Sequence, residues 1–304
     1  MGYGEYYYQT GIIALVIFIT FKIVFENKIR DYTEFVNYLV GDKKILNYSI
    51  NNLMNIFLLA SFIVMISGFG AYFKQEFILP AFWGSFIIAI LSFITFFQSI
   101  NGIIKANTYL IPILIGLVVL LGIKGNILLF NPNYIDTPLN FSWIIKSVLY
   151  ASYNSIILIP IIINLREVLT NKNQVKYIVL ITFFIMITLS IIIYIALSLH
   201  FNEIANLDIP IVYIASKFGI IYKYLYGIIV LIAIFTTAIS EGYSFLNNVS
   251  KTKKQYFIYS CIICIVSVCF SNIGFGKLLD VLYPVLGMLG LLQIVTLCVP
   301  KRIK

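Results

Sequence analysis

Long apolar runs dominate the pattern of hydrophobic and polar positions along the 304-residue chain. A bilayer core of about 30 Å needs about 20 apolar residues in helical form. Nine runs of about this length occur, at residues 6–25, 52–73, 79–99, 103–123, 143–165, 175–199, 219–241, 255–272 and 278–299. The run IVLITFFIMITLSIIIYIAL at residues 178–197 does not alternate between apolar and polar positions as a membrane β-strand does. The pattern therefore predicts an all-α polytopic membrane protein with about nine transmembrane helices.

The connections between the runs are mostly short, which predicts a single transmembrane helical domain over residues 1–304. Two connections are longer. Residues 26–52 carry apolar residues at helical spacing among charges, as in an amphipathic helix at a membrane surface. Residues 200–223 contain a short helix that is expected to begin at Pro210 and to end at Gly219.

Composition and charge fix the class of protein and its expected orientation. The chain is 61% hydrophobic and 11% charged, whereas a soluble domain is usually about 25% charged. Of the 21 lysines and arginines, fifteen fall on one side of the predicted spans and six on the other. Basic residues favour the cytoplasmic side, so the C-terminus and residues 26–52 are expected in the cytoplasm. The N-terminus of this chain and residues 200–223 are expected outside a multi-pass plasma membrane protein, and the net charge of +9 needs no nucleic acid to explain it.

A polar cluster interrupts the apolar run at residues 143–165. Its members are Ser152, Tyr153, Asn154 and Ser155. They lie at the middle of the run, where unpaired polar groups are most costly to bury. Pro160 leaves the carbonyl of Ile156 without its helical partner. Two interpretations stay open: a helix that opens at a solute site, or a kinked helix whose serines bond to their own backbone.

Three further groups of residues carry candidate chemistry. Thr236 and Thr237 offer hard oxygen ligands for a small cation, although such pairs are also common in packed membrane helices. Glu241 follows them at the end of a predicted span, where it is expected at the cytoplasmic interface, and it is a candidate proton carrier. Gly68 and Gly70 thin one helix face, which permits a helix break or the close approach of another helix or a ligand.

The sequence does not predict an enzyme. The GFG segments lack the setting of a nucleotide-binding loop, and no zinc-ligand spacing or nucleophile with a base occurs. No cofactor is expected beyond a sodium ion or a proton as coupling ion. The expected partners are the lipid bilayer and a small solute, nucleic acid is not among them, and the sequence sets no oligomeric state.

Four segments in order carry a resemblance to a known family. They are ASFIVMISGFGAYFKQEFILP at residues 60–80, LYASYNSIILIP at 149–160, IFTTAIS at 234–240 and LYPVLGMLG at 282–290. Together they resemble the bacterial YkvI-type membrane proteins, which are related to the amino acid–polyamine–organocation transporters with the LeuT-like fold. The resemblance covers nearly the whole chain.

The resemblance implies a core of ten helices in two inverted repeats, of which this chain supplies the second to the tenth. Residues 143–165 then correspond to the broken sixth helix, with the solute at residues 152–155 and Tyr153 as an aromatic gate. Thr236 and Thr237 occupy the place of a cation site. Members of the family begin with a glycine-rich broken helix, and this chain is expected to start just after it.

The expected function is that of a secondary transporter. Such a protein moves a small solute, an amino acid or a related amine or acid, by alternating access with a coupling cation. The alternative is a non-transporting sensor or structural partner, or an inactive fragment that lacks the first broken helix.

Overall fold

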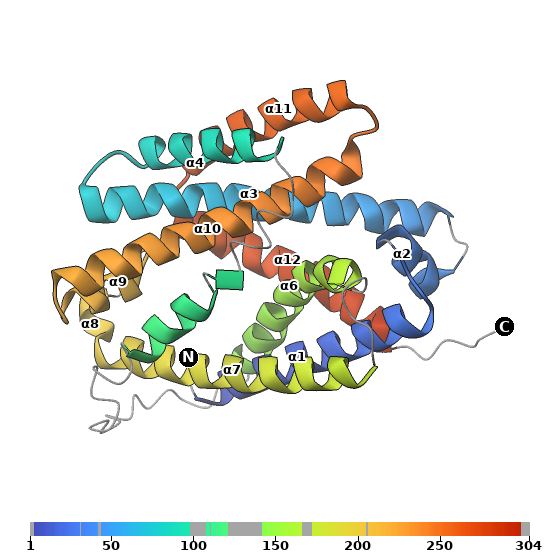
Figure 1. Cartoon of the computed structure of the whole chain (residues 1–304), viewed down its shortest axis with the longest axis horizontal. Coiled ribbons are helices and arrows are strands. Elements are labelled where there is room, and N and C mark those ends of the chain that lie inside the picture. Colours follow the sequence, from blue (N-terminus) through green and yellow to red (C-terminus); the bar gives the residue numbers. More distant parts are fainter. Residues whose placement is uncertain are drawn as a thin grey trace. The chain divides into compact units, whose positions relative to one another are not determined.

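The described part of the protein is helical. The structure, a computed structural model, describes residues 3–30, 32–41, 44–97, 108–109, 111–120, 142–165, 172–204 and 206–298. These residues form helices and turns, and no strand occurs among them. Figure 1 labels the helices: α1 Tyr3–Glu26, α2 Tyr32–Val40, α3 Lys44–Phe77, α4 Ala81–Thr95, α6 Ser142–Leu165, α7 Lys172–Leu199, α8 Phe201–Ile204, α9 Pro210–Ser216, α10 Ile220–Val249, α11 Lys253–Ser271 and α12 Phe275–Cys298.

Helices occur where the apolar runs predict them, and several have the length of a membrane span. Among the described residues, five are both long and apolar enough to cross a bilayer: 47–77, 173–197, 220–249, 253–271 and 275–297. Helices α1 and α6, of 24 residues each, coincide with two more of the predicted runs. A multi-pass membrane location is therefore supported.

The expected count of nine spans is not confirmed. Helix α4 has 15 residues, which gives a length of about 22 Å at about 1.5 Å per residue, short of a bilayer core of about 30 Å. Most of the predicted span at residues 103–123 lies outside the described residues, apart from a short apolar helix at Ile111–Leu120. The LeuT-like arrangement of ten helices is likewise not confirmed.

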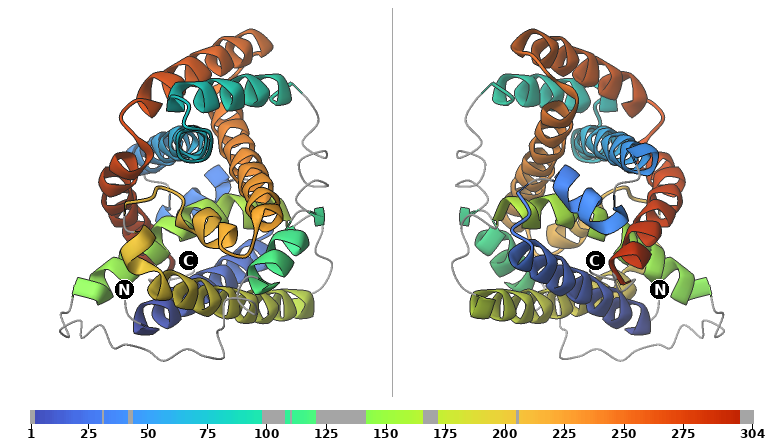
Figure 2. Two further views of the ribbon diagram at one scale, coloured as in Figure 1. Left: turned by 90° about the vertical axis from the view of Figure 1, so that its left-hand side faces the viewer. Right: turned by 90° about the vertical axis from the view of Figure 1, so that its right-hand side faces the viewer.

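The chain divides into two compact units, and each is described by itself. Unit 1 comprises Met1–Met54, Pro132–Ile191 and Val281–Lys304. In it, α1 and α2 pack against α6 (Figure 2). The cores of unit 1 are apolar and include Val16 and Phe21 from α1, Phe35 from α2 and Ile159 from α6. The helix that residues 26–52 predict is present as α2, whose Phe35 and Val36 are buried, Phe35 in this core.

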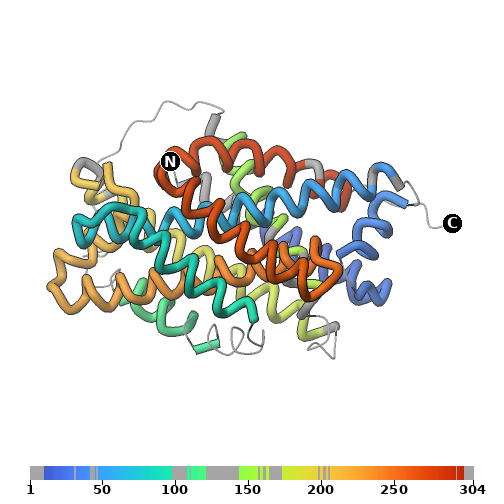
Figure 3. Tube along the Cα trace, turned by 90° about the horizontal axis from the view of Figure 1, so that it is seen from above, coloured from blue at the N-terminus to red at the C-terminus, as the bar shows by residue number. Residues whose placement is uncertain are grey.

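Unit 2 comprises Asn55–Asn131 and Ile192–Asp280. In it, α4 lies beside α11, and both α4 and α11 contact α10 (Figures 2 and 3). One apolar core joins α3, α4, α10 and α11. Its fully buried members are Phe62, Ile66, Ile88, Ala238 and Leu246.

The predicted short helix in residues 200–223 is confirmed as α9. It starts with Pro210 at its first position, where the missing N–H is not needed by the helix. It ends at Ser216, three residues before Gly219, and Gly219 instead precedes α10 with a φ of 124°. Glycine adopts this φ without the steric penalty that other residues meet.

Gly68 and Gly70 lie inside α3, which continues without a break to Phe77. A Cβ on Gly70 would lie 2.6 Å from the carbonyl oxygen of Ala81 and would overlap the Ser85 hydroxyl of α4. A Cβ on Gly68 would lie 3.0 Å from the Phe275 ring. The expected helix break at these glycines is therefore wrong, and their small size serves close packing.

Candidate functional site

The polar cluster of α6 lies in an unbroken helix of unit 1. Three of its side chains donate to the backbone four residues earlier: Ser152 Oγ to Val148 O at 2.6 Å, Asn154 Nδ2 to Tyr150 O at 2.8 Å and Ser155 Oγ to Ala151 O at 2.6 Å. These bonds satisfy the donors inside the helix, as the second interpretation of this segment expects. The bonds use the side-chain O–H and N–H donors, and the lone pairs of the two serine hydroxyls stay available as hydrogen-bond acceptors.

The expected helix opening at Pro160 does not occur in this structure. Helix α6 runs from Ser142 to Leu165 and includes Pro160. A proline removes one helical hydrogen bond, which can kink a helix without ending it. The solute-binding role of residues 152–155 thus lacks the unwound backbone that the resemblance implies, and it stays a prediction.

Tyr153 belongs to an aromatic group between α6 and α12 of unit 1. Its ring centroid lies 4.8 Å from that of Tyr283, and Tyr150 lies 6.3 Å from Tyr283. Both are distances at which aromatic rings attract one another. The arrangement holds Tyr153 against α12, and its proposed gating role stays a prediction.

Thr236 and Thr237 lie in α10 of unit 2. Both hydroxyls donate to the carbonyl of Ala233, at 3.1 and 2.8 Å, and Ser240 Oγ donates to the carbonyl of Thr236 at 2.8 Å. This pattern is typical of threonines and serines in membrane helices. The cation-binding role of the two threonines also stays a prediction.

Glu241 is buried in the core of unit 2. Its expected place at the cytoplasmic interface stays a prediction. Helix α10 continues to Val249, because Leu246 is fully buried and Phe245 packs against the same core. Glu241 is 3% exposed. Its Oε1 accepts a hydrogen bond of 2.6 Å from Ser61 Oγ of α3, and its Oε2 is buried without a hydrogen-bond partner among the described residues.

Neighbours of Glu241 and of Ser61 in the chain belong to the apolar core of unit 2. Ile239 and Phe62 are buried in this core, and Tyr243 packs against it. In the described part of the chain no lysine, arginine or histidine pairs with Glu241. A buried carboxylate without a counter-charge is costly, so the arrangement is that of a group that can bind a proton or a cation.

Ser61 is the residue of the candidate site that sequence reasoning missed. It lies 180 positions from Glu241 in the chain and is fully buried. Its position inside the apolar run 52–73 was the only signal, and a lone serine in a membrane helix usually bonds to its own backbone.

The loop between α7 and α9 is held by a charged group outside the spanning helices. Glu203 accepts a hydrogen bond of 3.1 Å from Tyr213 Oη and forms an ion pair with Lys217, whose Nζ lies 3.2 Å from His200 Nδ1. Hydrogen bonds from Lys217 and Tyr213 lower the pKa of Glu203. Burial and the charge of Lys217 lower the pKa of His200.

We expect this loop to lose stability as the pH falls. His200 takes up a proton more readily in the unfolded chain, because its pKa is lowered in the folded one. The stability that neutral His200 contributes is therefore lost as the pH falls below its ordinary pKa of 6.5. The contribution of Glu203 is present above its ordinary value of 4.5 and is lost as the pH falls through its lowered pKa. The thermal midpoint should therefore decline from neutral pH downward. Glu203→Gln should remove the contribution of the Glu203 carboxylate from the decline, and it should also lower the pKa of His200 further, because Glu203 raises that pKa. A midpoint that rises on acidification would contradict this.

Comparison with known proteins supports membrane location. No protein-family model matches the chain. It is 25% identical over 252 residues, 80% of this chain and 70% of the relative, to a Bacillus subtilis (strain 168) protein named uncharacterized membrane protein YkvI. It is 23% identical over 294 residues, 92% of this chain and 82% of the relative, to the uncharacterized protein YyaD of the same strain. Together with the apolar helices, these similarities support a YkvI-like multi-pass membrane protein.

Proposed function

We propose that the protein is a secondary transporter that moves a small solute across the cytoplasmic membrane by alternating access, with a proton bound at Glu241 as the coupling ion. The single observation that carries the proposal is the Glu241 carboxyl, which is buried in the core of unit 2 and bonded through one oxygen alone in the described part of the chain. Intramembrane carboxyls of this kind mark ion and proton pathways in membrane proteins.

Ser61 gives the site a second state. In the ionised state the carboxylate accepts the hydrogen bond from the Ser61 hydroxyl. In the protonated state the carboxyl gains an O–H donor, and Ser61 Oγ is an acceptor within reach on α3. Proton binding therefore allows Glu241 of α10 to donate to Ser61 of α3 in place of the present bond, and such a change can bias two arrangements of the helices.

The test is proton-driven uptake in proteoliposomes of the full chain. With an imposed inward proton gradient, we expect uptake of the transported solute from a panel of amino acids, amines and carboxylic acids. Glu241→Gln keeps the shape and removes the titratable group, so gradient-driven uptake should fall to the level of protein-free liposomes. Glu26→Gln, at an exposed position, is the matched control and should retain uptake. Uptake by Glu241→Gln that still follows the proton gradient would rule out this coupling role.

A second candidate is a membrane sensor or structural partner that does not transport. The observation that favours it is the unbroken α6, whose serines and asparagine bond to their own helix. In that case no solute of the panel accumulates in vesicles that contain the wild-type protein, with or without a proton or sodium gradient.

A further inference from the structure

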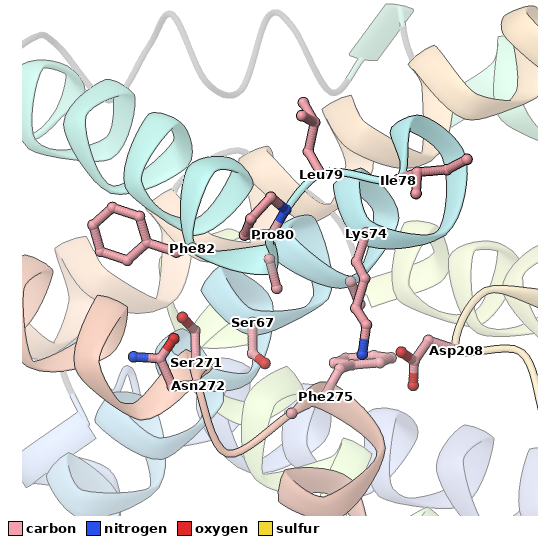
Figure 4. A pocket seen from close by; sticks show the side chains of 13 residues that line it. Ser67, Lys74, Ile78, Leu79, Pro80, Phe82, Asp208, Ser271, Asn272 and Phe275 are labelled. Atoms are coloured by element: carbon pink, nitrogen blue, oxygen red, sulfur yellow. The ribbon is translucent and has the colours of Figure 1, made fainter.

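A pocket of about 520 Å³ lies in unit 2, and neither Glu241 nor its partner Ser61 lines it. Its wall comes from the end of α3, the connection to α4, the segment before α9 and the turn between α11 and α12 (Figure 4). The volume is within the range of about 300–1,000 Å³ that is usual for small-molecule sites. All its lining residues belong to unit 2: Ser67, Ala71, Lys74, Ile78, Leu79, Pro80, Ala81, Phe82, Asp208, Ser271, Asn272, Gly274 and Phe275.

Opposite charges line the pocket without neutralising each other. Figure 4 shows the Lys74 side chain extending from α3 toward Phe275, and the Asp208 carboxylate turned toward the same region. Within the described ranges neither Lys74 nor Asp208 takes part in an ion pair. By contrast, Glu76, two residues after Lys74, pairs with Lys223 at 2.8 Å. The pocket thus keeps one ammonium and one carboxylate available to a ligand.

Gln75 holds the segment that carries Asp208 beside the end of α3 that carries Lys74. Its Nε2 donates to the carbonyl of Ile209 at 3.0 Å, and its Oε1 accepts from the Ile209 N–H at 2.9 Å. Gln75 follows Lys74 in the chain, and Ile209 follows Asp208. This double hydrogen bond therefore ties the segment that carries Asp208 to the last turns of α3.

A buried hydroxyl points into the same pocket. Ser67 is 2% exposed, and its Oγ has no hydrogen-bond partner among the described residues. An unsatisfied buried hydroxyl is unfavourable, and a ligand oxygen or nitrogen at this place would satisfy it. Figure 4 shows Ser67 on the inner wall, between Ser271 and Phe275.

The pocket also has an apolar side with an unusual backbone. Ile78, Leu79, Phe82 and Phe275 supply apolar side chains. Ile78 has a φ of 58°, a conformation that a β-branched residue rarely adopts, and it is 89% exposed. Strained backbone of this kind gathers at binding sites, where the surrounding structure maintains it.

We infer that this pocket binds a small zwitterion, a solute with one ammonium and one carboxylate group next to an apolar portion. The ligand carboxylate pairs with Lys74 and accepts from Ser67, its ammonium pairs with Asp208, and its apolar portion lies against Phe275 and Ile78. This inference rests on the proposed transport of a small solute and gives it a binding site outside the helices that carry Glu241 and the α6 cluster. Charge-assisted bonds at both ends would make the pocket select molecules with both charges.

The experiment is calorimetric binding to the full chain in detergent, with no gradient present. The probes are leucine, glycine and phenylalanine, together with two leucine analogues that each lack one charge, isopentylamine and 4-methylpentanoate. At least one amino acid should bind, and leucine should bind about tenfold or more tightly than either of its two single-charge analogues. Equal binding of a zwitterion and its single-charge analogues would overturn the inference, as would the absence of binding by all three amino acids.

Two variants test the assigned roles. Lys74→Gln should weaken amino-acid binding and leave isopentylamine unaffected, whereas Asp208→Asn should weaken it and leave 4-methylpentanoate unaffected. Lys277→Gln and Asp280→Asn change exposed residues near the same end of α12 that do not line the pocket, so they should bind as the wild type does. A uniform loss for every ligand, or no loss in either pocket variant, would overturn the assignment.

Two further measurements are needed. One distinguishes a free amino acid from a lipid headgroup as the ligand, and the other distinguishes failure of the pocket from failure of proton-coupled transport. Lysophosphatidylethanolamine carries an ammonium and a phosphate, and its binding in place of amino acids would mean a lipid headgroup site and overturn the inference. Amino-acid uptake that persists in Lys74→Gln/Asp208→Asn would refute the pocket and leave proton-coupled transport intact. Binding that follows the expected pattern, with no uptake in vesicles, would refute transport and leave the pocket.

Discussion

Replacement of Gly290 by leucine should destabilise unit 1 by about 3 kcal/mol or more. Gly290 of α12 faces Ser152 of α6, and a Cβ at this position would overlap the Ser152 carbonyl. Three residues earlier, a Cβ on Gly287 would lie 2.8 Å from the carbonyl oxygen of Leu149. The two glycines therefore let the backbones of α6 and α12 approach closely, as small residues do in membrane helices. The obstacle is backbone, which cannot turn away as a side chain can.

The measurement is the free energy of unfolding of Gly290→Leu in mixed micelles. Gly11→Leu is a matched control, because Gly11 also lies in a helix of unit 1 and a Cβ there meets nothing within 4 Å. The control should be neutral or slightly stabilised, since leucine favours a helix more than glycine does. Equal losses at both positions would show that the α6–α12 contact is not close in the protein.

Replacement of Phe62 by alanine should cost about 3 kcal/mol, the lower end of the usual range for this change in soluble proteins. Phe62 is fully buried in the core of unit 2, and its ring centroid lies 5.9 Å from that of Phe96. In a membrane the transfer of apolar surface contributes little, because lipid is as apolar as the core. The cavity and the lost packing contacts remain, and they account for the expected loss.

Thermal unfolding of Phe62→Ala in the same micelles tests this expectation. Phe270→Ala is the control, because Phe270 of α11 is 47% exposed and its removal leaves no enclosed cavity. The control should lose much less stability than Phe62→Ala. If both variants unfold together, the core around Phe62 is not packed as described.

Much of the helix pattern could be predicted from the apolar runs. The run at 175–199 corresponds to α7 and the run at 255–272 to α11, each within a few residues. The predicted helix boundaries were wrong where a helix continues through polar residues. The run at 219–241 ended at Glu241, yet α10 extends to Val249, because Leu246 and its neighbours pack into the core of unit 2.

The candidate sites were predicted less well, because the type of a residue does not show which residue its side chain contacts in the fold. The sequence singled out Ser152 and Asn154 as polar groups in a span, and the structure bonds both to their own helix. It singled out Glu241, but not Ser61, which makes the one hydrogen bond to Glu241 in the described part of unit 2. Gly68 and Gly70 were correctly identified as sites of close approach, although α3 does not break there.

The sequence by itself determined that the chain is a helical membrane protein and where most of its helices lie, because hydropathy and periodicity are local properties of a run of residues. Only the tertiary structure decided which polar groups meet. Ser61 and Glu241 are 180 positions apart, and Gln75 and Ile209 are 134 apart. Such pairs depend on which helices pack together, and the apolar surfaces that pack them are too alike along this chain to specify partners. The Glu241–Ser61 pair and the pocket are therefore properties of the packed helices.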